Sequence, residues 1–543
     1  MAQTKTDRAA EREAKNVAEE FLLGDIKLHS KVGQGGADHW MSLRYLFTNI
    51  TLTEDLFSNV AKIEISLVDA EGFIEAFPVI GDELIEITFK NKIITTDPKE
   101  AIMSQWFRLY DMQMSPSERK LAEYTLYGVS QEYVKSMQKR VCKRYTGLHS
   151  DSVKDIVRKY LGASKEIYVE KTRSTQTTVI PNWTPLEAIN YFASRSMTAN
   201  DEELELLESG FEMQLPSGSF YVFYEKLNEG FRFESIESLI LNQRDPTNIV
   251  KYVYAPRAVE GGILDTNQGM HGVSEIKVIG SFDAMRNLGR GLYASRLIAY
   301  DPIRMKYEII KYDYFEDVSG ESDESRRYHD FVTMDGNSRE ERKMIGEHSD
   351  MLGEHTSMTK LATTTKDHDI LFVPPYGETG AQIRYTTSTP IGVSDTTFKD
   401  GGAKSNNVEN WLLQRNAQEQ EFDNLRLKLT VAGNSSRHVG DLIWFEFPTY
   451  KPIDDHGSGY HQLYTGYYMV TKIEHIITQT RYTMDMEVVK NSFTTNLPGN
   501  DQQYDSGISE IQEGLDEMGR QGGKTGSRAM RNPDGSVRLV GGL

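Results

Sequence analysis

The sequence predicts a multidomain α+β protein that is rich in β-strands, with two similar antiparallel β units separated by a small α+β domain and a further mixed domain. Its 543 residues are too many for a single hydrophobic core. The stretch VIGDELIEITF, from Val79 to Phe89, recurs in altered form as HVGDLIWFEF, from His438 to Phe447. Between these two copies the apolar spacing becomes helical. Together these observations indicate a modular chain that carries one β unit twice.

The composition excludes several classes of protein. No run of about 18 apolar residues occurs, so the sequence predicts no insertion across a bilayer. The N-terminus carries charges where a signal peptide needs an apolar stretch, which favours folding in a cytoplasm. Cys142 is the single cysteine, which excludes an intramolecular disulfide and a cysteine-rich zinc site. The net charge of −19 argues against a surface that binds nucleic acid all over.

Residues 1–24 are predicted to form an N-terminal amphipathic helix that docks on another surface. Four apolar residues recur there at helical spacing, with Glu and Lys on the opposite side: Ala10, Ala14, Val17 and Phe21. The glycine-rich run from Gly33 to Gly36 follows as a flexible connection. It lacks the GK[ST] ending of a phosphate-binding loop, so we expect no phosphate site there.

Residues 25–147 are predicted to form the first β unit and residues 421–497 the second. Both stretches contain four strands with period-two alternation, in the same order and with similar spacing. In the first unit the strands are 61–70, 82–89, 106–114 and 122–130, and in the second they are 424–433, 441–447, 467–475 and 482–490. We interpret the two units as a duplication. The alternative is a chance likeness between two antiparallel units.

The strongest match between the units is a pair of turns. Gly81 and Asp82 precede the second strand of the first unit, and Gly440 and Asp441 precede the corresponding strand of the second. In this interpretation the four residues are structural, because each pair starts an equivalent strand.

Residues 148–242 are predicted to form the small α+β domain. A helix over 150–161 ends at Gly162, and the run from Thr184 to Glu187 has the residues of a capped helix start with proline at the first position. The segment 220–236 is typical of a hairpin that turns near Asn228 to Gly230.

Residues 243–420 are predicted to form a mixed α/β insertion domain. Segment 291–317 is rich in strand-forming residues, segment 338–361 has a helical composition, and segment 374–407 is loop-like. Residues 498–543 are polar and rich in glycine, and we expect this C-terminal tail to be ordered by docking on partners.

Residues that could carry chemistry are few, and we expect no catalytic, cofactor-binding or metal-binding residues. His348 and His355 are seven positions apart, whereas zinc-binding helices need histidines four apart. Acidic neighbours such as Asp201, Glu202 and Glu203 are expected by accident in a chain with 80 acidic residues.

A basic cluster lies within residues 132–145, beside Tyr133 and Tyr145. Its members are Lys135, Lys139, Arg140, Lys143 and Arg144. Basic and aromatic residues together could meet nucleic acid, but a charged rim or a subunit contact is the better interpretation. Cys142 lies within this cluster, and we interpret it as a packing residue.

Several segments resemble a known family. The runs IEISLVDAEGFIEAFPVIGDELIEITF, YGVSQEYVKSMQKRVCKRYTGLHSDSVKDIVRKYL and IPNWTPLEAINYFASRSM, and the hairpin FYVFYEKLNEGFRFESIESL, resemble the baseplate hub protein of contractile-tailed bacteriophages. The late segment LYTGYYMVTKIEHIITQTRYTMDMEVVKNSF resembles the second tube-like domain of that family. The resemblance covers residues 50–242 and 422–495.

This resemblance implies a fold and a function. Three chains would form a homotrimeric ring, and each would contribute two tube-like β-barrel domains to face a six-fold tail tube while matching a three-fold central spike. The implied partners are the tail tube protein, the central spike protein and other baseplate wedge proteins, and the implied location is the baseplate of the virion tail after assembly in the host cytoplasm. DNA would pass through the channel without specific binding, and an acidic wall would avoid trapping it.

Two alternatives stay open from the sequence. One is the hub or spike component of a type VI secretion-like injection machine, which shares the hub fold. The other is a cell-wall hydrolase carried on a tail, although no enzymatic activity is expected.

Overall fold

A computed structural model describes much of the chain. The described residues are 21–30, 40–70, 72, 74, 77, 79–91, 102–116, 122–172, 176–198, 220–243, 249–254, 271–281, 286–287, 290, 294–301, 306–313, 334, 382–387, 408–422, 425–449, 460–461, 463–491, 528–531 and 537–540. The chain separates into two compact parts, and the larger comprises Met1–Asp350 and Glu354–Leu497. In the smaller part, β22 (Arg528–Arg531) and β23 (Val537–Val540) form an antiparallel pair.

The first predicted β unit contains the four expected strands, and we call this set the first repeat. Its members are β4 (Lys62–Asp69), β5 (Leu84–Asn91), β6 (Ile102–Pro116) and β7 (Ala122–Ser130). Their order in the sheet is β4-β7-β6-β5, with every pair antiparallel. The alternation predicts which side is buried, because Ile63, Ile65 and Leu67 of β4 all lie in one hydrophobic core.

The second repeat has the same arrangement. Its members are β18 (Leu425–Ala432), β19 (Leu442–Glu446), β20 (Gly466–Thr478) and β21 (Tyr482–Lys490). Their order is β18-β21-β20-β19, again with every pair antiparallel. The four strands expected in each unit are therefore confirmed, and the two sets share one topology.

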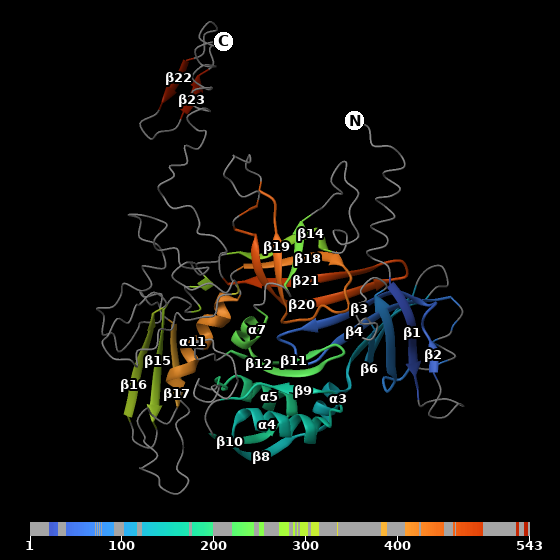
Figure 1. Cartoon of the computed structure of the whole chain (residues 1–543), viewed down its shortest axis with the longest axis horizontal. Coiled ribbons are helices and arrows are strands. Elements are labelled where there is room, and N and C mark those ends of the chain that lie inside the picture. Colours follow the sequence, from blue (N-terminus) through green and yellow to red (C-terminus); the bar gives the residue numbers. More distant parts are fainter. Residues whose placement is uncertain are drawn as a thin grey trace. The chain divides into compact units, whose positions relative to one another are not determined.

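Further strands flank each repeat (Figure 1). Beside the first lie β1 (Phe21–His29), β2 (Trp40–Ser42) and β3 (Phe47–Asp55), and beside the second lie β13 (Val250–Tyr254) and β14 (Gly272–Ser281). β3 pairs with β4, and β14 pairs with β18 in the equivalent position. β13 runs parallel to both β14 and β19, so these two flanking strands and the four strands of the second repeat form a closed cycle of pairings. In the described part of the first repeat the pairings end at β2 without such a cycle.

Two expected boundaries change as a result. Residues 1–20 of the expected N-terminal helix lie outside the described residues, whereas Phe21–Gly24 belong to strand β1, and Phe21 to Leu23 pair with β5. The insertion domain expected from residue 243 instead contributes β13 and β14 to the second repeat. Both changes arise because strands that are distant in the sequence pair with each other. A local pattern of apolar residues does not predict such pairing.

The small domain packs helices against short sheets. Its elements are α3 (Gln131–Gln138), β8 (Val141–Gly147), α4 (His149–Ile156), the π-helical turn η2 (Val157–Leu161), β9 (Ile167–Val169), β10 (Gln176–Trp183), α5 (Pro185–Ala193), β11 (Tyr221–Lys226), β12 (Gly230–Ser235) and α7 (Ile236–Asn242). β8 pairs with β10 and buries Val141 in the small domain's core. The domain therefore starts before residue 148, the boundary expected from the sequence.

The structure confirms the helix start, the helix end and the hairpin turn that the sequence predicts in this domain. Thr184 and Glu187 form a reciprocal capping box with Pro185 at the helix start. Gly162 ends the helical stretch with a left-handed φ of 56°. The β11–β12 hairpin turns through Asn228, whose φ of 65° is also left-handed.

The remaining elements of the larger part form a three-stranded sheet and a helix: β15 (Ala294–Asp301), β16 (Lys306–Asp313), β17 (Gln382–Thr387) and α11 (Val408–Glu421). β17 falls in segment 374–407, so the expectation of a loop is wrong there. The helix expected over 338–361 lies outside the described residues. Among the described helices, none is long and apolar enough to cross a membrane.

Candidate functional site at the joint between the repeats

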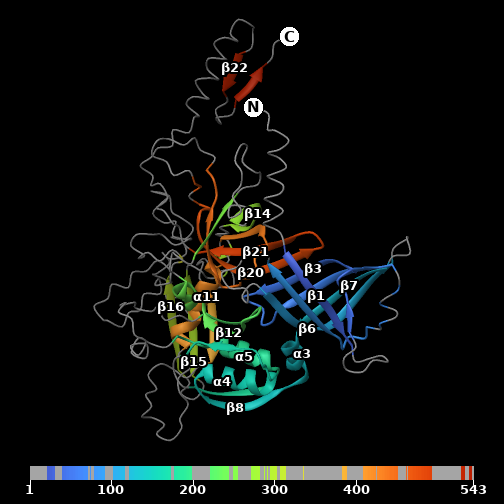
Figure 2. The same ribbon diagram turned by 45° about the vertical axis from the view of Figure 1, so that its right-hand side comes forward.

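The two repeats are joined directly, edge to edge. β3, which flanks the first repeat, pairs antiparallel with β20 of the second, from Asp55 opposite Lys472 to Asn49 opposite Thr478. Figures 1 and 2 show the two strands side by side from different angles. One sheet therefore runs without a break from the second repeat into the first.

β20 divides one edge between two partners. Its first residues, Gly466 to Met469, pair with β19 of the same repeat, and those from Lys472 onward pair with β3. The register against β21 shifts between Val470 and Lys472, so Thr471 is the extra residue of a bulge. A bulge bends a strand and increases its twist, which lets one long strand change partners.

Glu54 on β3 ties three chain segments together at this joint. Its side chain is 0% exposed. The carboxylate accepts hydrogen bonds from the backbone N–H of Leu227 at 3.0 Å and of Val439 at 3.2 Å. It also lies 3.0 Å from Nδ1 of His438, which therefore carries the proton of that contact. First repeat, second repeat and β11–β12 hairpin meet at this one acid.

The pKa values of the two histidines near Glu54 are shifted in opposite directions, although Glu54 raises both. Burial disfavours the charged form of His438, but the negative charge and hydrogen bond of Glu54 outweigh burial and raise the pKa of His438 above its ordinary value. His475 is fully buried on β20, where burial lowers its pKa to about 4 although the charge of Glu54 opposes this. Nδ1 of His475 lies 2.9 Å from the hydroxyl of Tyr482.

A second buried acid fixes the same hairpin to the first repeat. Glu225 on β11 accepts hydrogen bonds from the backbone N–H of Ala61 at 3.0 Å and from the hydroxyl of Ser130. Lys165 of the small domain pairs with the same carboxylate. Burial raises the pKa of Glu225, and Lys165 opposes that shift. The small domain is thus attached through charged groups that are paired.

The turns expected to match are both left-handed but are offset by one residue. Gly81 has a φ of +93° and Gly440 a φ of +85°. The backbone N–H of Leu109 donates to the carbonyl of Glu83, and that of Val470 donates to the carbonyl of Asp441 in the equivalent place. Asp441 therefore corresponds to Glu83 and not to Asp82.

The side chains of those two acids support this alignment. Glu83 accepts from the backbone N–H of Ile80 and of Gly81, and Asp441 accepts from that of His438. Each acid closes the turn just before its strand begins. In the sequence, Asp441 aligns with Asp82 instead, because the first copy has one more residue between its glycine and its strand.

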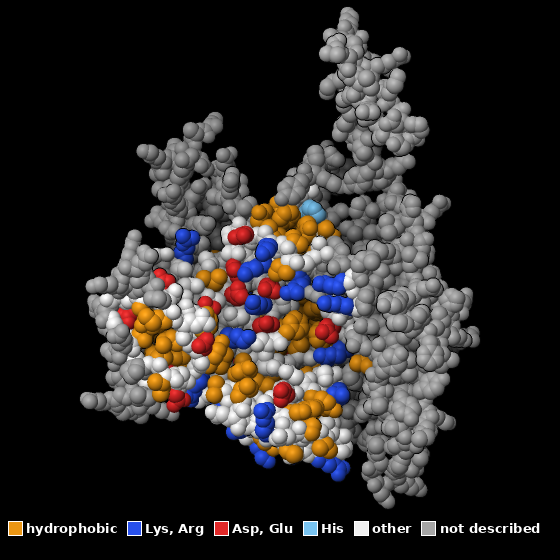
Figure 3. Space-filling view, turned by 180° about the vertical axis from the view of Figure 1, so that it is seen from behind, with side chains coloured by type: hydrophobic (Ala, Val, Ile, Leu, Met, Phe, Trp, Pro, Cys, Tyr) orange, Lys and Arg blue, Asp and Glu red, His pale blue; other side chains and the backbone are white. Residues whose placement is uncertain are grey.

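The side of the second repeat that faces away from its core carries paired charges. Lys428 on β18 contacts Asp485 at 3.0 Å and Glu474 at 3.3 Å. Lys472 on β20 contacts Glu474 at 2.6 Å. Burial by itself would lower the pKa of Lys428, but these acids raise it. The surface view of the molecule in Figure 3 likewise shows acidic and basic side chains interspersed.

A cavity of about 470 Å³ lies beside the joint. Its lining combines basic, acidic and apolar side chains from both repeats, the small domain and α11, and includes Asp55, Phe57, Asn190, Arg415 and Glu487. This mixed lining does not select one class of ligand.

The other candidate residues from the sequence concern metal, phosphate and acidic sites. The described residues contain no group of three or more His, Cys, Asp or Glu side chains placed to hold a metal ion. His348, His355, the acids 201–203 and the glycines 33–36 lie outside the described residues.

The basic cluster makes contacts within the small domain. Lys143 contacts Asp155 at 2.8 Å, and Lys139 donates to the carbonyl of Tyr160.

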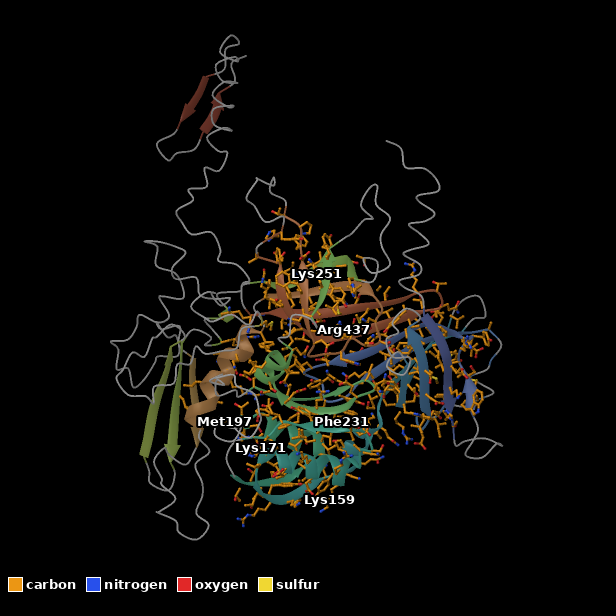
Figure 4. The ribbon with its side chains drawn as sticks, in the orientation of Figure 1. Lys159, Lys171, Met197, Phe231, Lys251 and Arg437 are labelled. Atoms are coloured by element: carbon orange, nitrogen blue, oxygen red, sulfur yellow. The ribbon has the colours of Figure 1, made fainter. Side chains whose placement is uncertain are left out.

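Cys142 is exposed, so its interpretation as a packing residue is wrong. The strand β8 places it on the outward side, opposite the buried Val141. Figure 4 shows the small domain with Lys159 and Phe231 labelled, and Arg437 in the second repeat.

Comparisons with known proteins find only distant similarities. No family model matches the chain, and no curated protein matches it. Among solved structures, it is similar to a tail protein from Neisseria meningitidis MC58, with 8% identity over 87% of this chain and 96% of the other, at a TM-score of 0.43. It is also similar to the 43 kDa tail protein of prophage MuSo2 from Shewanella oneidensis, with 10% identity over 86% and 98%, at a TM-score of 0.42.

A third similar structure comes from a secretion system. The E. coli c3393 protein is described as a component of the type VI secretion system with structural similarity to the T4 bacteriophage tail proteins gp27 and gp5. The identity is 8% over 82% of this chain and 73% of that protein, at a TM-score of 0.33. The structural neighbours of the chain are thus phage tail proteins and type VI secretion components.

Proposed function

We propose that the chain is a structural hub subunit of a contractile phage tail, in which three copies form a ring between the six-fold tail tube and the three-fold central spike. The observation that carries this proposal is the pair of repeats with one strand order, joined edge to edge by β3 and β20. A chain that carries the unit twice supplies six similar units from three copies. Such a ring presents six units to a tube while keeping three-fold symmetry for a spike.

The joint supports a scaffolding role. Glu54 and Glu225 each bind donors from the repeats or the small domain at fully buried positions. Buried acids whose hydrogen bonds are satisfied hold neighbouring segments in one geometry. A ring subunit needs this, because its two units must keep a fixed angle for the ring to close. In the proposal, tube, spike and wedge proteins then dock on the ring at the baseplate of the virion, after assembly in the host cytoplasm.

The paired charges of the second repeat suit the wall of a DNA channel. Lys428 and Lys472 already contact carboxylates on neighbouring strands. A cation that is neutralised by a fixed acid attracts a phosphate less, since binding would first have to break the existing pair. The net charge of −19 acts in the same direction over longer distances.

The proposal includes no enzymatic activity. A zymogram of the purified chain against peptidoglycan tests this point. A clear zone would favour the tail-associated hydrolase over a purely structural hub.

The test of the ring is the mass in solution, measured by light scattering after a sizing column. Because one chain has a mass of 61.8 kDa, the trimer is expected at about 185 kDa. The measurement is repeated with the spike protein, since a hub can close on its spike. A monomer in both conditions would contradict the proposal.

A further inference from the structure

Two strand edges lack a strand partner among the described residues. β6 pairs with β5 only over Ile102–Arg108, so the same edge has no strand partner from Asp111 to Pro116. β14 pairs with β13 only at Gly272 and Val273, so its outer edge is open from Ser274 to Ser281. Unpaired edges present backbone donors and acceptors to another strand.

These two open edges are the equivalents of the two edges that meet at the joint. β6 and β20 occupy the same position in their repeats, and both carry a bulge at the same place, at Tyr110 and at Thr471. β14 and β3 are equivalent because each pairs with the first strand of its repeat. Within one chain, β20 pairs with β3. In the described part of the chain, the corresponding edges of β6 and β14 pair with no strand.

We infer that β6 of one copy pairs antiparallel with β14 of the next copy, so that the joint between the repeats is reproduced between chains. This inference rests on the proposed ring for the number of copies. The contact is heterologous, because each copy offers β6 at one side and β14 at the other. Such head-to-tail contacts close into rings when the rotation between copies permits it.

The shared topology also gives the register of this pairing. In the first repeat, Leu52 of β3 lies opposite Ile63 of β4, and Ile63 lies opposite Gly128 of β7. In the second repeat, Val278 of β14 lies opposite Leu427 of β18, and Leu427 lies opposite Val488 of β21. Gly128 and Val488 both face the residue that precedes the bulge, Leu109 and Val470. Val278 is therefore the equivalent of Leu52.

On β6, Met114 lies four positions after the bulge residue Tyr110, and on β20, His475 lies four positions after the bulge residue Thr471. Met114 is therefore the equivalent of His475. Since His475 lies opposite Leu52, Met114 of one copy is placed opposite Val278 of the next.

The exposure of the side chains agrees with this register. At the joint within the chain, His475 and Leu52 are each 0% exposed. At the open edges, Met114 is 58% exposed and Val278 is 44% exposed. The neighbours on the same faces, Met112 and Ile276, already pack against the two cores. A second strand would cover both exposed apolar side chains and extend each core across the new joint.

Cross-linking tests the register directly. In a Cys142→Ser background, Met114→Cys and Val278→Cys are combined in one chain, and the protein is oxidised and run on a non-reducing gel. Covalent dimers and trimers are expected, and reductant should remove them. The control combines Met114→Cys with Lys277→Cys, because Lys277 points to the other face of β14. A disulfide needs Cα atoms within about 7 Å and converging Cβ atoms, so the test pair should give about tenfold more covalent oligomer than the control.

A second pair of variants tests the edge without cysteine. Met114→Asp should shift the solution mass from about 185 kDa to the monomer, because it places an unpaired charge in the new core. Gln113→Asp, on the opposite face of β6, should leave the trimer intact.

The outcomes separate this inference from the proposed ring. A trimer that does not cross-link and tolerates Met114→Asp would overturn the β6–β14 pairing while the ring stands. A monomer that does not cross-link, even with the spike protein present, would overturn both.

Discussion

Glu54 and His438 lie 384 positions apart in the sequence, yet the carboxylate of Glu54 is 3.0 Å from Nδ1 of His438. The same carboxylate holds the backbone N–H groups of Leu227 and Val439. Since these donors come from the small domain and the second repeat, the first repeat reaches both through one buried acid. The geometry of the joint therefore depends on a residue that touches no solvent.

Replacing Glu54 should lower the free energy of unfolding more than removing a more exposed ion pair does. Glu54→Ala leaves buried donors unsatisfied, and the expected loss is about 3–5 kcal/mol of unfolding free energy. Glu54→Gln keeps one acceptor and should lose less. Urea unfolding followed by far-ultraviolet circular dichroism measures both. The control is Glu86→Gln, whose partly exposed carboxylate lies 3.4 Å from Nζ of Lys27 and 3.3 Å from Nε2 of His29, with an expected loss below about 1 kcal/mol. Equal losses for Glu54→Ala and the control would contradict this role.

His475 should make the fold sensitive to acid. Its pKa is lowered to about 4 in the folded chain from 6.5, so between these values the unfolded chain binds a proton that the folded chain does not. Stability should therefore fall as the pH drops from about 6.5 to 4. His475→Gln should remove about 3 kcal/mol of this loss, the equivalent of the pKa difference. Urea midpoints at pH 4.5, 5.5, 6.5 and 7.5 test the slope, and an unchanged slope would count against the buried neutral histidine.

His438 should act in the opposite sense. Its pKa is raised in the folded chain, since the carboxylate of Glu54 outweighs burial. Its stabilising effect is then complete below the unfolded pKa of about 6.5 and is lost as the pH rises through the folded value. His438→Gln should destabilise the protein more at pH 6 than at pH 9. The same urea series compares the variant with the unmodified chain, and a larger loss at pH 9 would reverse the assignment.

The two turn glycines should differ in their tolerance of a side chain. A Cβ at Gly440 would lie 3.1 Å from Cδ2 of Leu239 and 3.2 Å from the hydroxyl of Tyr224, whereas a Cβ at Gly81 meets nothing within 4 Å. Both positions have positive φ, so both carry the backbone cost of about 1–2 kcal/mol. Gly440→Val should lose clearly more stability than Gly81→Val, and both should reduce the fraction of the proposed trimer. Thermal unfolding and light scattering check this, and normal trimers from both variants would refute the role of the turns.

Removing acids from the charged side of the second repeat should make it bind DNA. Glu474→Gln with Glu487→Gln deprives Lys472 and Lys428 of carboxylates that they contact. Freed cations attract phosphates, so the affinity for duplex DNA should rise and should fall again steeply with salt. Fluorescence anisotropy with a labelled duplex at 50 and 200 mM salt measures this. The control is Glu123→Gln, which removes one negative charge from an exposed position on β7.

The parts of the fold that follow from local pattern were predictable. The capping box of Thr184 and Glu187 and the turn at Asn228 depend on residues a few positions apart. The strands of the two repeats follow from period-two alternation, so their existence and order were predictable as well. The joint between the repeats was not predictable, because β3 and β20 pair across more than 400 positions, counted from Glu54 to Ile473.

Some of the missed features had a signal in the sequence. Ile50, Leu52 and Glu54 share one face of β3, so an acid interrupts an apolar stripe. An acid at such a position must find buried donors, but the sequence does not say which. The parallel pairing of β13 with β19 had no local signal, because parallel partners lie far apart in the chain.

The pairing of β3 with β20 has a consequence for synthesis on the ribosome. β3 is complete at Asp55, but its partner residues begin at Lys472, so most of the chain is made while that edge of β3 has no partner. An open edge of this kind is the part of a nascent chain most prone to wrong pairing. The joint therefore cannot close before β20 has been made, and until then β3 leaves the first repeat with an open edge. Conditions that prolong translation should then cost more of this protein to aggregation than of a protein whose strands pair with near neighbours.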